Sequence, residues 1–141
     1  MRVLIDTNVL ISAALFPESI PYRAYVKAVT TPCRGVICEQ NADELRRIFN
    51  RKWPDKTRAL ETFLALAMST LTIVPIPEQE ITEEAKVRDV KDRPILRAAV
   101  CCRADVLLTG DKDFLESGIC KPRILSPSQF LEKALKSEVL S

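Results

Sequence analysis

Five short apolar stretches, separated by longer segments with helical spacing, constrain the fold of this chain most. They read RVLI at 2–5, RGVICE at 34–39, LTIVPI at 71–76, DVLLTG at 105–110 and RILS at 123–126. Short apolar runs rich in β-branched residues are typical of strands buried on both faces. Such strands alternate with helices in α/β domains, whose crossover connections make the strands run parallel. The pattern therefore predicts an α/β domain with a mainly parallel sheet of four to five strands.

Prolines mark most of the expected helix boundaries, because the chain has nine prolines and only three glycines. A first helix is expected to end before Pro17 and a second to begin at Pro21. In all, helices are expected over 8–16, 21–29, 41–52, 54–69, 81–89 and 93–104. The helix over 93–104 is apolar almost all round, so it is expected to be buried. Ser126 and Pro127 are expected to begin a final helix as N-cap and first helical residue.

The bulk composition is that of an ordinary globular protein. The 141 residues suit one domain over 1–141, of which 47% are apolar and 28% charged. The net charge of +2 neither demands nor excludes a nucleic-acid partner. No apolar run approaches the roughly 20 residues of a membrane span, and the acidic start differs from a signal peptide. We therefore expect a cytoplasmic protein that does not bind membranes.

The absence of histidine restricts the chemistry that the chain can perform. It excludes Ser-His-Asp and Cys-His machinery, so proton transfer near pH 7 falls to carboxylates, lysine, tyrosine or a metal-bound water. The five cysteines form no C-x-x-C pair, and their spacing argues against a zinc site. We expect reduced thiols, with the adjacent Cys101 and Cys102 packed as small apolar residues.

Two acidic positions in the first third of the chain are candidate site residues. Asp6 follows the first strand directly, where it can cap the next helix or belong to a site. Asn8 has the same two readings, and its amide could orient a neighbouring carboxylate. Glu44 borders the apolar face of its helix, as a site acid or as a boundary residue paired with Arg47. Asp43 is a weaker candidate, as is Glu39 if that helix begins earlier.

Further acids lie in the last third of the chain. Asp92 precedes an expected helix and is a natural N-cap, a role that does not exclude a functional one. Asp89 is expected to be a solvated loop acid. Asp111 and Asp113 follow the fourth strand, where they can form a capped turn or join a site with Thr109.

These acids can converge over one end of the sheet, because sites in parallel sheets form beyond the carboxyl ends of the strands. Several carboxylates in one pocket repel, and some must be protonated unless a cation neutralises them. An oxygen-only cluster suits Mg²⁺ or Mn²⁺, which bind phosphate and lower the pKa of bound water.

Four motifs resemble those of the PIN domain family of metal-dependent ribonucleases. They are VLIDTNVLI, ADELRRIF, DRPILRAAV and LLTGDKDFL, and their order and spacing agree over essentially the whole chain. The resemblance implies a three-layer α/β/α fold and a pocket that binds one or two Mg²⁺ or Mn²⁺ ions. It also implies endonucleolytic cleavage of RNA phosphodiester bonds.

The resemblance assigns roles residue by residue. Asp6, Glu44 and Asp92 match the family's catalytic and metal-binding acids, and the last motif offers both Asp111 and Asp113. Asn8 matches the companion polar residue, and Thr109 is a supporting hydroxyl. The choice between Asp111 and Asp113 as direct metal ligand stays open. The cations nearest the acids in sequence, Arg93, Lys112, Arg47 and Lys91, are candidates for holding the RNA backbone.

Small single-domain relatives of this kind resemble toxins of toxin–antitoxin pairs. The resemblance implies a homodimer and a small antitoxin partner whose tail enters the acidic pocket. Two alternatives remain at this point. One is a PIN-like module that binds RNA or protein without cutting, and the other is a phospho-accepting receiver domain, although the third strand lacks the acceptor aspartate that a receiver needs.

Overall fold

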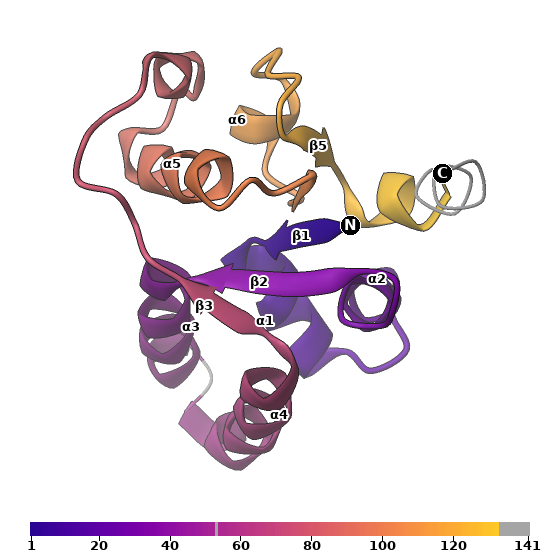
Figure 1. Cartoon of the computed structure of the whole chain (residues 1–141). Coiled ribbons are helices and arrows are strands. Elements are labelled where there is room, and N and C mark those ends of the chain that lie inside the picture. Colours follow the sequence, from indigo (N-terminus) through magenta and orange to yellow (C-terminus); the bar gives the residue numbers. More distant parts are fainter. Residues whose placement is uncertain (53, 133–141) are drawn as a thin grey trace.

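The computed structural model describes residues 1–52 and 54–132, and these form one five-stranded sheet with all strands parallel (Figure 1). The strands are β1 (Arg2–Ile5), β2 (Arg34–Cys38), β3 (Thr72–Val74), β4 (Val106–Leu108) and β5 (Arg123–Leu125). Their order in the sheet is β3-β2-β1-β4-β5. The predicted parallel sheet is confirmed. The order differs from the flavodoxin-like order 2-1-3-4-5, so the receiver alternative is wrong.

Helices cover both faces of the sheet, as the predicted three-layer architecture requires. They are α1 (Thr7–Leu15), α2 (Ile20–Ala28), α3 (Glu39–Lys52), α4 (Thr57–Thr70), α5 (Arg93–Cys101) and the short α6 (Lys112–Leu115). Three short 3-10 helices are also present, η1 (Pro54–Lys56), η2 (Thr82–Lys86) and η3 (Val90–Asp92), and residues 127–132 begin a further helix. In Figure 1, α1 to α4 lie below the sheet and α5 and α6 above it.

The alternation of side chains along the strands builds two separate cores. Val3 and Ile5 of β1 point into the core under α1 to α4, whereas Leu4 between them points toward α5 and α6. All three side chains are 0% exposed. A parallel strand covered on both faces needs apolar side chains on both, which explains the unbroken apolar runs in the sequence.

The helix boundaries differ from the expected ones where side chains cap or extend them. Helix α1 begins at Thr7, one residue early, because Asp6 is its N-cap and accepts a hydrogen bond from the Thr7 amide. Helix α3 begins at Glu39, two residues early. The final helix begins as predicted, since the Gln129 amide donates to Ser126 Oγ at 3.2 Å. That helix is described up to residue 132, and its expected continuation lies outside the described residues.

The expectation that the helix over 93–104 is buried all round is wrong. Helix α5 ends at Cys101, and it buries Ile95, Leu96 and the alanines beside them, while Val100 and Cys101 are exposed. The reason is the thin layer on this face, where only α5 and the four-residue α6 cover the sheet. Cys101 therefore does not pack as an apolar residue, and Cys102 does so only in part. No helix within the described residues has the length and apolar character to cross a bilayer.

Candidate functional site

The centre of the site is the junction where β1 and β4 end side by side. Ile5 pairs with Leu108, so the next residues of the two strands, Asp6 and Thr109, are brought together. Thr109 Oγ1 donates to Asp6 Oδ2 at 2.7 Å, and the other carboxylate oxygen, Oδ1, accepts from the Thr7 amide at 2.8 Å. Asp6 is 5% exposed and Thr109 0% exposed. Asp6 can therefore be both the N-cap of α1 and a residue of the site. Its Oδ1 accepts the capping hydrogen bond, and its Oδ2 contacts Thr109 in the site.

Thr109 also connects this carboxylate to the next acid along the chain. Its Oγ1 accepts from the Asp111 amide at 3.0 Å while it donates to Asp6. Asp111 in turn accepts from the Asp113 amide at 2.9 Å as N-cap of α6. One buried hydroxyl thus fixes the Asp6 carboxylate relative to the turn that carries Asp111 and Asp113. The supporting role predicted for Thr109 stays a prediction, now with these two hydrogen bonds behind it.

Asp92, at the start of α5, lies close to Asp6 and Asp111. It occupies the N-cap position of α5, yet its side chain makes no capping hydrogen bond. Its carboxyl faces that of Asp111 instead. Burial, followed by this contact and the charge of Asp6, raises the pKa of Asp92 to about 8. Burial is also the main reason why the pKa of Asp6 rises to about 6, with smaller contributions from the charges of Asp111 and Glu44.

Helix α3 carries three candidate acids, Glu39, Asp43 and Glu44. Of these three, only Glu44 lies close to Asp6 and Asp92. It is half-buried, its charge acts on Asp6, and it lines one cleft together with Asp92. Asp43 is exposed and lines a different cleft, between α3 and α4. Glu39 is exposed, and its Oε1 accepts from the Ile76 amide at 3.3 Å. Asn8 lies exposed on the first turn of α1, so its orienting role stays a prediction.

A second group of acids shares Asp92 with the first. Carboxylate oxygens of Asp89, Asp92 and Asp113 lie within 4.8 Å of one another. Arg88 forms an ion pair of 3.0 Å with Asp113. Sequence reasoning expected Asp89 to be a solvated loop acid and missed this grouping. The available signal was its position three residues before Asp92, which the single turn η3 brings close together.

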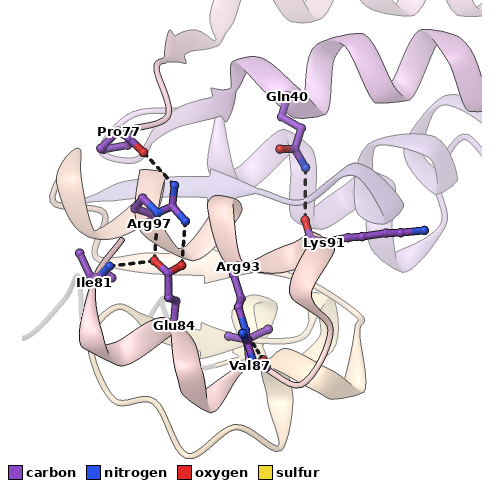
Figure 2. Close-up of polar contacts among 8 residues, drawn as sticks. All are labelled: Gln40, Pro77, Ile81, Glu84, Val87, Lys91, Arg93 and Arg97. Carbon is purple, nitrogen blue, oxygen red and sulfur yellow. Dashed lines mark hydrogen bonds and ion pairs between the residues drawn. The ribbon is translucent and has the colours of Figure 1, made fainter. Parts of the chain in front are cut away.

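The segment that carries Asp89 and Asp92 is held to α5 by polar contacts (Figure 2). Arg97 donates to both oxygens of Glu84, at 2.9 and 2.7 Å, and also to the Pro77 carbonyl at 3.0 Å. Further along, Arg93 Nε donates to the Val87 carbonyl at 2.9 Å. Fixed hydrogen bonds of this kind keep an irregular crossover, and the acids on it, in one position.

A cleft of about 530 Å³ opens beside the acids, with cations along its walls. Glu44 and Asp92 form its acidic end, and Arg47, Arg51 and Lys91 supply positive charge. Arg47 and Lys91 were predicted, whereas Arg51 was missed although it lies one turn after Arg47 on the same face of α3. Of the other predicted cations, Lys112 is exposed on α6, and Arg93 is partly buried with its Nε on Val87.

The donor set fits a hard divalent cation. Every side chain in the cluster offers oxygen, and the raised pKa values of Asp6 and Asp92 reflect burial and repulsion that a cation would offset. Two neighbouring buried oxygens, Thr7 Oγ1 and Asn41 Oδ1, have no hydrogen-bond partner within the described part of the chain. Water held by an ion at this edge would satisfy such acceptors.

The acids predict a pH-dependent stability in metal-free buffer. The pKa of Asp6 is raised from 3.8 to about 6, and that of Asp92 from 3.8 to about 8. The folded chain then keeps protons that the unfolded chain has lost, so the stability present below about pH 4 is lost as pH rises through these values. We expect the free energy of unfolding to fall between about pH 5 and 8, where no histidine titrates. Urea unfolding in EDTA measures this, and a flat profile would contradict it.

Comparisons with known proteins agree with this geometry. The family model described as PIN domain matches residues 2–113. No curated protein sequence matches the chain. Among solved structures, VapBC2 from Rickettsia felis bound to a DNA fragment from its promoter aligns with a TM-score of 0.68. That match has 17% identity and covers 89% of this chain and 98% of the other.

Two further structures have the same fold. A toxin–antitoxin complex from Klebsiella pneumoniae has a TM-score of 0.61 and 26% identity, covering 89% of this chain and 97% of that one. VapC20 from Mycobacterium tuberculosis, a toxin that cleaves the sarcin–ricin loop, has a TM-score of 0.59 and 13% identity. This alignment covers 83% of the present chain and 95% of VapC20. The family match spans most of the sequence and includes the acids of all four motifs, and the chain belongs to the PIN domain family.

Proposed function

We propose that this chain, acting as a single domain over 1–141, is an endoribonuclease that depends on Mg²⁺ or Mn²⁺. One observation carries the proposal: Asp6, Glu44, Asp92 and Asp111 converge at one edge of the sheet, beside a cleft lined by cations. An acidic centre next to a cationic groove suits a phosphodiester substrate. The fold shared with VapC20, described as a toxin that cleaves the sarcin–ricin loop, supports RNA as that substrate.

The ion would be held by Asp6, Asp92 and Asp111, with Glu44 and Asp113 completing the set. When bound, it would lower the pKa of a coordinated water and neutralise charge on the reacting phosphate. Asp92 belongs to both acidic groups, one with Asp6 and Asp111 and the other with Asp89 and Asp113. This sharing suits either one or two ions.

The protein's own residues hold the other parts of the reaction. Thr109 fixes the rotamer of Asp6 through the 2.7 Å hydrogen bond, so the carboxylate is oriented before substrate arrives. Glu44, which is half-buried and lines the cleft, would orient the attacking water. Arg47, Arg51 and Lys91 bind backbone phosphates along the cleft walls. Lys112 and Arg93 add positive charge near the acids.

The biological role that we propose is the toxin of a toxin–antitoxin pair, active in the cytoplasm. Support comes from the shared fold with VapBC2 and with the Klebsiella toxin–antitoxin complex. The partners would be a small antitoxin and a second copy of the chain in a homodimer. A positive cleft with an acidic end can be blocked by a peptide that carries a cation for the acids and carboxylates for the arginines.

Metal addition is the direct test of the proposed activity. Mixed RNA should be cleaved with Mn²⁺ or Mg²⁺ and left intact with EDTA. The same ion should raise the thermal midpoint at pH 8 by roughly 5–10 °C when present at about 100 times its Kd. The shift should be smaller at pH 5, where protons compete for Asp6 and Asp92. Cleavage that is unchanged by EDTA would point to a contaminating nuclease and would refute the proposal.

A further inference from the structure

The edge of the sheet opposite the acids carries a row of cations. Three strands begin with an exposed arginine: Arg2 on β1, Arg34 on β2 and Arg123 on β5. Two more exposed cations, Arg103 and Lys121, lie in the turns just before β4 and β5. These five residues are here named the amino-edge row. No salt bridge within the described part of the chain involves any of them.

Backbone hydrogen bonds fix the sequence of charges along this edge. Arg2 and Arg34 are register partners on adjacent strands. On the other side, the Asp105 amide donates to the Arg2 carbonyl at 2.8 Å, and the Arg123 amide donates to the Asp105 carbonyl at 3.0 Å. Across the edge the residues follow the strand order, Arg34, Arg2, Asp105, Arg123, on strands about 4.8 Å apart. Arg123 is the register partner of Val106, so it lies one residue further along the strands than the other three. One carboxylate stands among the cations, and it already accepts from the Arg2 amide at 2.7 Å.

Three cations of the amino-edge row occupy positions that are unfavourable for the stability of the fold. Arg2 and Arg34 place like charges on directly paired positions, which is unfavourable in a sheet. Arg103 has φ of 59°, in the left-handed region where helices usually end in glycine. A cation there gains from the dipole at the end of α5, and so does Arg2, whose Nη1 donates to the Cys102 carbonyl; the helix end accounts for none of the other three. Arg34, Lys121 and Arg123 form no ion pair within the described residues and gather at one edge, which indicates an anionic ligand.

A cleft of about 460 Å³ is lined by part of the amino-edge row, and its lining indicates which class of ligand would fit. Arg103, Lys121 and Arg123 supply its positive charge and Asp105 one carboxylate, while Val100, Ala104 and Pro122 supply apolar surface. A nucleotide unit matches this lining, because its phosphate meets the cations while its sugar or base packs on apolar atoms. An acidic peptide would match the charges without using the apolar surface.

We propose that the amino-edge row is a second nucleic-acid contact, which binds the phosphate backbone of a folded RNA whose cleaved segment lies at the acidic edge. The inference rests on the proposed function for its substrate. The two edges are separated by the four residues of β1, or about 13 Å of strand. A dinucleotide, whose stacked units are about 3.4 Å apart, cannot reach from one to the other, whereas a hairpin of some 25 nucleotides can.

Binding in EDTA tests the row without requiring cleavage. The Kd of a fluorescent 25-nucleotide hairpin is measured against salt for wild type and for Arg34→Gln/Arg123→Gln. The double variant should bind about 10-fold more weakly near 100 mM salt, with a log–log salt slope smaller by about 1–2. The matched control Arg58→Gln/Lys86→Gln removes two exposed cations outside the row and outside the acidic cleft, and should match wild type. Arg34→Lys/Arg123→Lys should keep most of the slope.

Cleavage assays then test the amino-edge row and the proposed nuclease activity separately. With Mn²⁺, the Gln double variant should cleave a dinucleotide RNA as fast as wild type but the hairpin with a higher KM. Loss of the salt slope without any cleavage would support the row and refute the nuclease. Equal hairpin binding by wild type and double variant, equal loss in the control variant, or no hairpin binding at all would overturn the row. If the row instead binds an acidic protein, wild type and the double variant should bind the hairpin equally well.

Discussion

Replacing Asp6 with asparagine is expected to lower RNA cleavage by at least about 100-fold while the fold stays intact. Asp6 is the most buried acid of the cluster at 5% exposed, and it is charge-coupled to both Asp111 and Glu44. Asparagine has nearly the same shape but removes the negative charge that a cation requires. Its carbonyl oxygen can still accept from the Thr7 amide, and its amide can donate to Thr109 Oγ1. The loss should therefore fall on activity alone.

The measurement is the initial rate of RNA cleavage with Mn²⁺, compared with Asp43→Asn. Asp43 is a matched control because it is an exposed acid on α3, one residue before Glu44, and lines a different cleft. This control should cleave at the wild-type rate. If Asp6→Asn cleaved as well as Asp43→Asn, the acids would not form the active centre, and the non-catalytic binding module would become the better interpretation.

The stability of the same variant gives an independent check of the geometry. The pKa of Asp6 is raised to about 6 mainly by burial, so its ionised form opposes folding at pH 8. Asparagine carries no such charge. Asp6→Asn should therefore be more stable than wild type in EDTA at pH 8, by about 2 kcal/mol, and similar to it near pH 4. An aspartate that only capped α1 would give the opposite result, a loss of stability on substitution.

The sheet and the acids at the ends of its strands could be predicted because both depend on local patterns. Apolar runs define the strands, and parallel pairing then brings Asp6 and Thr109 to one edge. Asp111 could be distinguished from Asp113 only in three dimensions. Asp111 faces Asp92 and acts on Asp6, while Asp113 pairs with Arg88 and lies near Asp89.

The features that could not be predicted depend on contacts between irregular segments. Asp89 joins Asp92 through one 3-10 turn, which has no hydrophobic period to reveal it. Arg51 requires the exact rotation of α3 relative to the crossover that carries Lys91. The exposure of Val100 on α5 depends on how little of that face the short α6 covers. Periodicity within a single element gives only one part of these arrangements, the shared face of Arg47 and Arg51 on α3.

Glu84 and Arg97 form the ion pair with the largest expected effect on stability, and no sequence pattern indicated it. Their side chains are 7% and 11% exposed, and the guanidinium contacts both carboxylate oxygens at 2.9 and 2.7 Å (Figure 2). Glu84 also accepts from the Ile81 amide at 2.9 Å. These bonds, led by the one from Arg97, lower the pKa of Glu84. The pair lies 13 residues apart and joins η2 to α5, and so fixes the crossover before Asp89 and Asp92.

Glu84→Ala should lower the free energy of unfolding at pH 7 by clearly more than the loss of an exposed ion pair does, because it leaves the half-buried Arg97 guanidinium without its partner. Urea unfolding measures the loss. The double variant Glu84→Leu/Arg97→Met removes both charges and should recover most of it, since a buried pair replaced by apolar residues is often neutral. Glu83→Ala is the matched control, because its partner Lys86 is exposed and the pair contributes little. If Glu84→Ala and Glu83→Ala lowered the free energy of unfolding equally, water would already screen the pair of Glu84 and Arg97. Packing of η2, and not charge, would then hold the crossover in place.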